Sequence, residues 1–432
     1  MSTKRKCLVV QVAAWSATLA EQMLRRPGNL AVHAIDPVFP AVTCPAQASF
    51  RTGTKPTQHG MIANGVYDDR LKKILFWEQA ASLVKGPRIW DAFRAQGGTV
   101  GMMFWQQSLG ESVDLIVSPR PIHKHSGGMI QAVYTKPASL YERLRAQVGR
   151  DFNLMHYWGP LASRKSSEWI VASIEAVLQM PDVAPDLLMT YIPHLDYDLQ
   201  RHGPAHRKVE RALNELAGYL QRLYEAAQAA GYEVIFIGDY AIGEVSEGAV
   251  FPNGALRTAD LFATQSVRGM QYPDFFSGRA FAMVDHEVAH VYTRDEEAQA
   301  QAQAALSDLV GVAEVLDREA QAAWGIQHPA SGDLVLVAEA GYWFAYPWWT
   351  DRQEAPDFAT HVDIHNKPGF DACELFFGWP PGTVSVDTTK VKGSHGRVGP
   401  DRRIALAGTM DWKAAPADPA DVGAALGRWL VG

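Results

Sequence analysis

The chain has 432 residues, of which 47% are hydrophobic and 20% are charged, and its formal net charge is −7. This composition is that of an ordinary globular protein with enough apolar side chains for a large core. The acidic balance, with no basic run longer than Lys4-Arg5-Lys6, excludes binding of a nucleic acid duplex through its phosphates as a main role. No apolar run approaches the roughly 18 residues that a transmembrane helix needs, so we expect no membrane partner.

The N-terminus and the cysteines favour a cytoplasmic protein. The apolar run Cys7-Leu8-Val9-Val10 is too short for the core of a signal peptide and is not followed by a small-residue cleavage site, so we expect it to begin a strand. Cys7, Cys44 and Cys373 are widely spaced, form no CxxC pair and indicate no disulfide framework. The oligomeric state is unknown from the sequence.

Strand-like and helix-like segments alternate along the chain, which is typical of a mostly parallel central sheet with helices on both faces. In chain order we expect strands over residues 7–13, 30–35, 99–104, 186–193, 233–238 and 333–338, and helices over residues 17–26, 87–96, 205–230 and 417–430. The helix over 205–230 is the clearest, because its apolar residues step by four and three along one face. We expect a loop between residue 193 and that helix.

Residues 249–330 have a looser pattern, with short strands expected over 279–284 and 288–292 and a helix over 295–309. We therefore predict two units. Residues 1–248 and 331–432 form the α/β core, and residues 249–330 form a smaller inserted subdomain.

Two aspartates follow expected strands of the core. Asp196 comes after the strand over 186–193, and Asp239 comes after the strand over 233–238. The carboxyl ends of parallel strands share one edge of a sheet, and ligand sites of open α/β sheets lie at that edge. We expect both carboxylates there.

Thr43 stands where a helix is expected to begin, in the run Pro40-Ala41-Val42-Thr43-Cys44-Pro45. A threonine hydroxyl needs a metal or a base before it can act as a nucleophile at neutral pH. A helix N-terminus also offers N–H groups to an anionic phosphoryl group. The alternative is a threonine that only caps the helix.

The segment around Thr43 resembles the nucleophile region of the nucleotide pyrophosphatase/phosphodiesterase family. That family has the pattern Pro-x-x-Thr-x-Pro-Asn-His, followed by Thr-Gly, Pro and His-Gly. The matching residues here are Pro40, Thr43, Pro45, Thr52, Gly53, Pro56, His59 and Gly60, and Asn64, Tyr67 and Asp68 continue the match. The resemblance implies an alkaline-phosphatase-like α/β fold with Thr43 as the nucleophile. Ala46 and Gln47 replace the family Asn and His, and the Gln47 amide could serve the phosphoryl oxygens instead.

Three later motifs of the same family also have counterparts. Asp196 and Gly203-Pro204 match Pro-Asp-x-x-x-His-x-x-Gly-Pro, Asp239 matches Asp-His-Gly-Met, and His395 matches the late Gly-x-His-Gly. The resemblance implies that Asp196 and His395 hold one divalent ion and that Asp239 and Thr43 hold another, with zinc as the expected metal.

Three family ligands are replaced. Gln200 and Tyr240 stand in place of histidines, and Ala13, or less favourably Gln11, stands in place of the aspartate that ends the first strand. A neutral phenol is a weaker donor than imidazole. The possible substitute ligands or phosphate contacts are Gln200, His202, Tyr240, His365 and Arg397.

Two more histidines, His286 and His290, are four residues apart. On one strand they would face the same side but lie about 13 Å apart, too far to share an ion. We expect each to be a structural histidine.

These motifs predict a metal-dependent hydrolase that cleaves a phosphodiester or pyrophosphate bond of a small phosphorylated substrate through a phospho-threonine intermediate at Thr43. One or two divalent ions are expected. The replaced ligands leave two alternatives open. One is a catalytically silent member that binds a phosphorylated ligand, and the other is a related phosphonate or sulfate-ester hydrolase.

Overall fold

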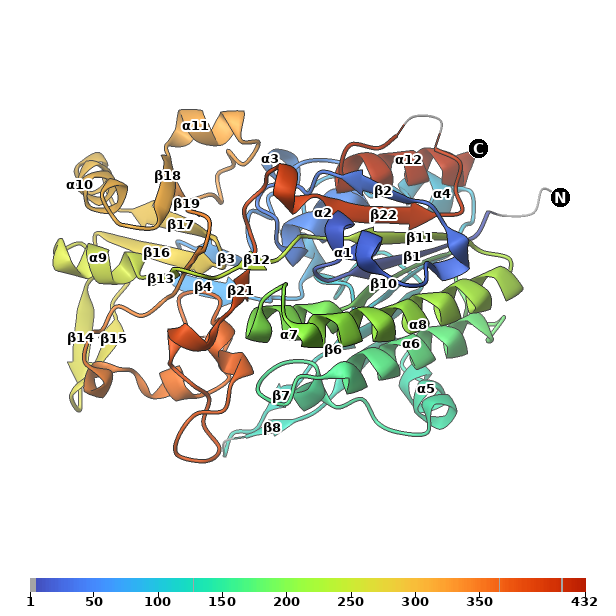
Figure 1. Ribbon diagram of the computed structural model, residues 1–432, viewed down its shortest axis with the longest axis horizontal. Helices are drawn as coiled ribbons and strands as arrows, with labels where there is room; N and C mark the ends of the chain where they lie inside the picture. Colours follow the sequence, from blue (N-terminus) through green and yellow to red (C-terminus); the bar gives the residue numbers. More distant parts are fainter. Residues whose placement is uncertain (1–4, 127, 365, 413–414) are drawn as a thin grey trace.

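The computed structural model describes residues 5–126, 128–364, 366–412 and 415–432. Its centre is an eight-stranded sheet with the strand order β2-β22-β11-β1-β10-β5-β6-β9 (Figure 1). The strands are β1 (Cys7–Val12), β2 (Val32–Ile35), β5 (Val100–Met103), β6 (Leu115–Pro119), β9 (Val133–Lys136), β10 (Leu187–Ile192), β11 (Glu233–Gly238) and β22 (Ile404–Gly408). The five strands from β11 to β6 run parallel, whereas β22, β2 and β9 pair in antiparallel fashion. The predicted mostly parallel α/β fold is confirmed.

The middle strand β1 is buried along its whole length, which explains its nearly continuous apolar sequence. Its alternate side chains point to the two opposite faces of the sheet, and each face has its own hydrophobic core. Leu8, Val10 and Val12 pack with α1 (Ala17–Gln22), α6 (Arg164–Leu178) and α8 (Arg207–Ala229). Cys7 and Val9 pack with α2 (Thr43–Thr52), α4 (Asp91–Ala95) and α12 (Pro419–Val431). Helices therefore cover both faces of the sheet, as Figure 1 shows.

The register of the three central strands brings their carboxyl ends to one level. Val12 of β1 lies opposite Ile192 of β10 on one side and Gly238 of β11 on the other. Residues that directly follow these strands therefore meet at one edge, as the sequence predicts for Asp196 and Asp239.

The segment after β10 is not the expected loop but the helix α7 (His194–His202). Leu195 and Leu199, four residues apart, are fully buried in the core shared with α8. The prediction was wrong because the other residues of this segment are mostly polar, and their burial depends on contacts made elsewhere in the chain.

A second, four-stranded antiparallel sheet has the order β16-β17-β19-β18 and lies at the left in Figure 1. Its strands are β16 (Ala280–Asp285), β17 (Val288–Thr293), β18 (Val312–Leu316) and β19 (Leu334–Ala338), and its helices are α9 (Pro252–Thr258), α10 (Glu296–Ser307) and α11 (Arg318–Ala323). This sheet includes β19, which follows residue 330. The division of the chain at residues 249 and 330 stays a prediction.

Short elements complete the described chain. They are α3 (Pro56–His59), α5 (Leu140–Val148), and the paired strands β3 (Gly65–Asp68) with β4 (Lys73–Phe76), β7 (Ile122–His123) with β8 (Met129–Ile130), β12 (Gly243–Glu244) with β21 (Gly393–Ser394), β13 (Gly248–Val250) with β20 (Tyr342–Phe344), and β14 (Thr264–Val267) with β15 (Met270–Pro273). Among the helices that the structure describes, none combines the length and the apolar character needed to span a bilayer.

Candidate active site

Thr43 is the first residue of α2, and Val42 in extended conformation holds the cap position. The Thr43 hydroxyl lies 3.3 Å from Asp239 Oδ2 and 3.4 Å from the Tyr191 hydroxyl. Only 2% of Thr43 is exposed. The alternative of a threonine that only caps the helix is therefore wrong, since the hydroxyl points to a carboxylate and not to the N–H groups of α2.

Asp239 follows β11 and is fully buried. Its Oδ1 accepts hydrogen bonds from the backbone N–H groups of Ala14 (3.1 Å) and Tyr240 (2.9 Å), while Oδ2 faces Thr43. Burial, together with the nearby charge of Asp196, raises the pKa of Asp239 well above its ordinary value. Ala14 has a positive φ of 58°, a backbone conformation that favours glycine.

Asp196 lies in the first turn of α7, and both of its carboxylate oxygens already accept hydrogen bonds. The Tyr240 hydroxyl donates to Oδ1 at 2.8 Å, and Gln200 Nε2 donates to Oδ2 at 2.7 Å from one helical turn further on. Burial raises the pKa of Asp196 to about 6, although these two hydrogen bonds act in the opposite direction.

His395 reaches the site because the pairing of β12 with β21 places its loop beside the residues that follow β11. Its Nδ1 lies 2.8 Å from the carbonyl oxygen of Ala41. A carbonyl only accepts, so Nδ1 carries the proton and Nε2 carries the lone pair. Burial lowers the pKa of His395 to about 3, so the ring is neutral.

His395 belongs to a stack of four rings, which we name the ring column: Phe370, His286, His395 and Tyr240. The centroid distances along it are 3.7, 3.7 and 3.5 Å, and the rings of Tyr240 and His395 are parallel within 2°. His286 sits in the tight turn between β16 and β17 with φ 62° and not on a strand. This position agrees with the two strands expected over residues 279–284 and 288–292, which leave His286 between them. Sequence reasoning missed Phe370 as a residue of the site region.

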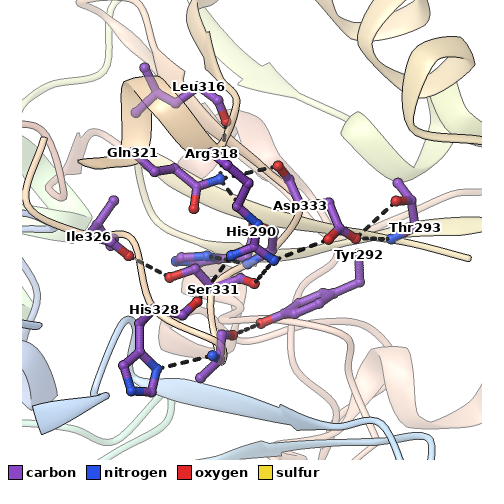
Figure 2. A network of polar contacts seen from close by, with 12 residues as sticks. His290, Tyr292, Thr293, Leu316, Arg318, Gln321, Ile326, His328, Ser331 and Asp333 are labelled. Carbon is purple, nitrogen blue, oxygen red and sulfur yellow. Dashed lines mark hydrogen bonds and ion pairs between the residues drawn. The ribbon is translucent and has the colours of Figure 1, made fainter. Parts of the chain in front are cut away.

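His290 lies on β17, away from the site, in the polar network of Figure 2. Its Nδ1 accepts from the N–H of Gly332 at 3.1 Å, so Nε2 carries the proton and donates to the carbonyl of Ile62, also at 3.1 Å. Asp333 anchors the same network by accepting from Thr293 and Arg318. Both nitrogens of His290 are used, so the expectation of a structural histidine is confirmed.

Gln47 follows Thr43 by one helical turn, so both side chains leave the same face of α2. Its Oε1 accepts from the N–H of Gln106 at 2.7 Å. Its Nε2 is buried and has no acceptor within the described part of the chain. A buried amide donor without an acceptor is costly, and an anionic ligand would satisfy it.

Asn64 links the start of α2 to the second sheet. Its Oδ1 accepts from the N–H of Cys44 at 3.0 Å, and its own N–H and Nδ2 donate to Asp285 at 2.7 and 3.1 Å. Burial raises the pKa of Asp285 to about 7. Asp285 had no signal in the sequence, because its partner lies 221 residues away.

Of the remaining candidates, His202 and Arg397 have their hydrogen-bond contacts with other residues. His202 ends α7, where it contacts Lys208 Nζ at 3.1 Å and stacks on His206. The guanidinium of Arg397 has a buried Nη1 with no partner among the described residues, and its backbone N–H donates to Glu287. His365 lies outside the described residues.

The two residues of β1 considered in place of the family aspartate, Ala13 and Gln11, add no metal ligand beside Asp196 and Asp239. Ala13 extends β1 by a hydrogen bond to Ile192 and carries only a methyl group. Gln11 is buried within β1, and its Oε1 has no partner in the part of the chain that the structure describes.

A model of the type I phosphodiesterase/nucleotide pyrophosphatase family matches residues 22–371. The chain belongs to this family. The resemblance inferred from Thr43 and the aspartates is thereby confirmed, and the family is one of hydrolases. An uncharacterized pyrophosphatase/phosphodiesterase of Schizosaccharomyces pombe is 22% identical over 224 residues, which cover 51% of this chain and 40% of that protein. The chain thus spans about 40% of the length of this relative.

Solved structures show the same fold. Murine ectonucleotide pyrophosphatase/phosphodiesterase 5 is 14% identical with a TM-score of 0.62, covering 99% of this chain and 95% of that chain. Phosphonoacetate hydrolase from Sinorhizobium meliloti 1021, in complex with phosphonoformate, is 16% identical with a TM-score of 0.64, covering 99% and 96%. At these identities the likenesses show that the chain shares the overall fold of these proteins.

Members of this family generally depend on divalent metals, but the residues of this chain do not fit the family's two-ion site. Within the described residues, no group of three or more His, Cys, Asp or Glu side chains could hold a metal ion. Both oxygens of Asp196 carry hydrogen-bond donors, and the Tyr240 ring covers His395.

Proposed function

We propose that this chain is a hydrolase that cleaves a phosphodiester, pyrophosphate or phosphonate bond of a small substrate, with Thr43 as the nucleophile and Asp239 as its base. The observation that carries the proposal is the 3.3 Å contact between the Thr43 hydroxyl and Asp239 Oδ2 at the buried start of α2. A burial-raised carboxyl pKa makes Asp239 a stronger base than an exposed aspartate when it is ionised.

In the proposed first step, Asp239 takes the hydroxyl proton while the Thr43 oxygen forms a bond to phosphorus. The bond from phosphorus to the leaving group breaks, and the leaving group takes a proton from water. In the second step water attacks the phosphorus, the bond from phosphorus to the Thr43 oxygen breaks, and that oxygen takes back the proton held by Asp239. The proton lost by the attacking water passes to solvent, and the phosphorylated product leaves with the oxygen of that water. The start of α2 and Gln47 Nε2, which has no acceptor among the described residues, supply N–H groups for the phosphoryl oxygens.

Relatives support the substrate class. One solved structure is an inactive threonine-to-alanine variant of the murine protein in complex with AMP, and others hold phosphonoacetate or phosphonoformate. We therefore propose a small phosphorylated or phosphonate substrate. The cytoplasmic location stays a prediction, and the expected zinc is not carried into the proposal because the donor set does not fit it.

A second candidate function is the catalytically silent member that binds a phosphorylated ligand without cleaving it. The observation that favours it is the hydrogen bonding of both Asp196 oxygens by neutral donors, which leaves the site without the cation that relatives use.

The test is hydrolysis of bis(4-nitrophenyl) phosphate, ADP and phosphonoacetate by the wild type, Thr43→Ala and Thr43→Ser, with AMP binding measured on all three. Turnover by the wild type that Thr43→Ala loses and Thr43→Ser partly keeps supports the first candidate. Turnover that survives in Thr43→Ala contradicts the nucleophile. AMP binding without turnover of any substrate selects the silent member.

A further inference from the structure

We infer that Tyr240 and Gln200 take the place of a divalent cation at Asp196, and that this centre works without a resident metal. The metal content of this centre can be measured independently of whether Thr43 turns a substrate over. It rests on the contacts of Tyr240, on the donors to Asp196 and on the residue at position 13.

Tyr240 contacts Asp239, His395 and Asp196, the three residues that would otherwise face an ion. Its backbone N–H donates to Asp239 Oδ1 at 2.9 Å, its ring lies flat on His395 at 3.5 Å, and its hydroxyl donates to Asp196 Oδ1 at 2.8 Å. Only 2% of Tyr240 is exposed. One side chain thus fills the space between Asp196 and His395.

The two donors at Asp196 are neutral groups, but each presents a hydrogen with partial positive charge to the carboxylate. A zinc ion binds a carboxylate oxygen at about 2.0–2.2 Å, whereas here a hydroxyl and an amide nitrogen stand at 2.8 and 2.7 Å. Their hydrogens point at the two oxygens and stabilise the ionised carboxylate, as a cation would. Neither donor could stay in place with an ion on the same side of the carboxylate.

The three departures from the family pattern act together. Gln200 and Tyr240 replace neutral nitrogen ligands with hydrogen-bond donors, and Ala13 removes a negative charge from the end of β1. Loss of a dication removes two positive charges and loss of one carboxylate removes one negative charge, so the formal charge of the buried centre falls by one unit. Ala14 instead brings its backbone N–H to Asp239 at 3.1 Å, so that carboxylate has a fixed donor too.

The test measures metal directly. The purified wild type is dialysed against Zn²⁺ or Mn²⁺, its metal content is determined, and its melting temperature is recorded with and without a chelator. We expect the same metal content as in Asp196→Ala and no shift of the melting temperature. Near one ion per chain in the wild type, lost in Asp196→Ala, would overturn the inference.

A variant with Ala13→Asp, Gln200→His and Tyr240→His restores the family donors on the same backbone. We expect it to gain one or two ions per chain and to melt at a higher temperature with Zn²⁺ present, because an ion that binds only the folded state stabilises it. A folded variant that binds no ion would contradict the view that these three positions exclude the metal.

Tyr240→Phe gives a readout that needs no restored site. It keeps the ring on His395 but removes the hydrogen-bond donor to Asp196 Oδ1. We expect a lower melting temperature, and we expect most of this fall to require the ionised carboxylate of Asp196. The same change made on an Asp196→Asn background should lower the melting temperature less. If Tyr240→Phe lowers the melting temperature equally in the wild type and in Asp196→Asn, the Tyr240 hydroxyl does not stabilise the negative charge of Asp196.

Discussion

The hydroxyl of Tyr240 donates a 2.8 Å hydrogen bond to Asp196, a residue 44 positions earlier in the chain. The bond runs between residues that follow two strands of the same sheet, one in α7 and one after β11. It ties together the two positions at which the family pattern places ligands of different ions. At this edge of the sheet both oxygens of Asp196 are held by protein donors, while Thr43 and Asp239 remain in contact.

Asp239→Asn should abolish the base while it keeps the fold. The new amide oxygen can accept from Ala14 and Tyr240, and its nitrogen can face the Thr43 hydroxyl. We expect kcat to fall by about 10²- to 10⁴-fold with a smaller change in KM. The matched control is Asp333→Asn in the second sheet, which removes an ion pair with Arg318 and should change stability and not kcat.

The dependence of kcat/KM on pH in the wild type also tests Asp239 as the general base. Asp239 must be ionised to accept a proton, and its pKa lies well above the ordinary value. We therefore expect kcat/KM to rise with pH through a carboxyl pKa higher than about 4, the value for an ordinary aspartate. A rate that is flat from pH 4 to 8 would contradict Asp239 as the base.

Much of this arrangement follows from the sequence. Continuous apolar runs predict β1, β10 and β11, and the shared edge of parallel strands then brings Asp196 and Asp239 together. Periodicity also predicts α8 almost to its ends. These features depend on residues close together in the chain or on rules that all parallel sheets obey.

Other features depend on contacts that local patterns do not contain. The Tyr240 side chain takes its direction from His395, which is 155 positions away, and Asn64 pairs with a carboxylate 221 positions away. His286 stacks between Phe370 and His395, which lie 84 and 109 positions further along the chain, so its neighbours in the sequence do not indicate these contacts. Sequence reasoning therefore found the candidate residues but not the way in which they fill the site.

Gln47→Leu should weaken substrate binding and catalysis together, because it removes the buried Nε2 that has no acceptor within the described residues. A hydrogen bond to a charged group contributes about 1.5–3 kcal/mol, so kcat/KM should fall by roughly 10- to 150-fold. Gln47→Glu is the sharper variant, since a carboxylate beside the phosphoryl oxygens repels them and should lower kcat/KM further. An unchanged kcat/KM in both variants would remove Gln47 from the site.

Asp196→Asn should change how stability depends on pH. The pKa of Asp196 is about 6 in the folded chain and about 4 in an unfolded chain, so the folded state binds the proton more tightly. The resulting stability is present below pH 4 and is lost as pH rises through 6, a change on the order of 3 kcal/mol. The variant lacks this titration, and the buried Gln200 Oε1, free among the described groups, can accept from the new amide after a flip.

Urea denaturation at pH 5 and pH 8 measures this difference. The wild type should lose more stability between the two pH values than Asp196→Asn does. The control is Asp198→Asn on the same helix, a side chain that is 36% exposed. If Asp196→Asn and the wild type lose the same stability, the raised pKa of Asp196 is contradicted.

Asn64→Ala should destabilise the chain through two groups at once. It leaves the N–H of Cys44 at the start of α2 without its acceptor and takes one side-chain donor from the buried Asp285. Each buried group without a partner costs about 1–3 kcal/mol, so we expect a loss of about 2–4 kcal/mol in the free energy of unfolding. Asp285→Ala removes the carboxylate, and in the double variant the effect of Asn64→Ala should shrink to the part due to Cys44. Additive effects would mean that Asn64 and Asp285 act independently, and the link between α2 and the second sheet would then lie elsewhere.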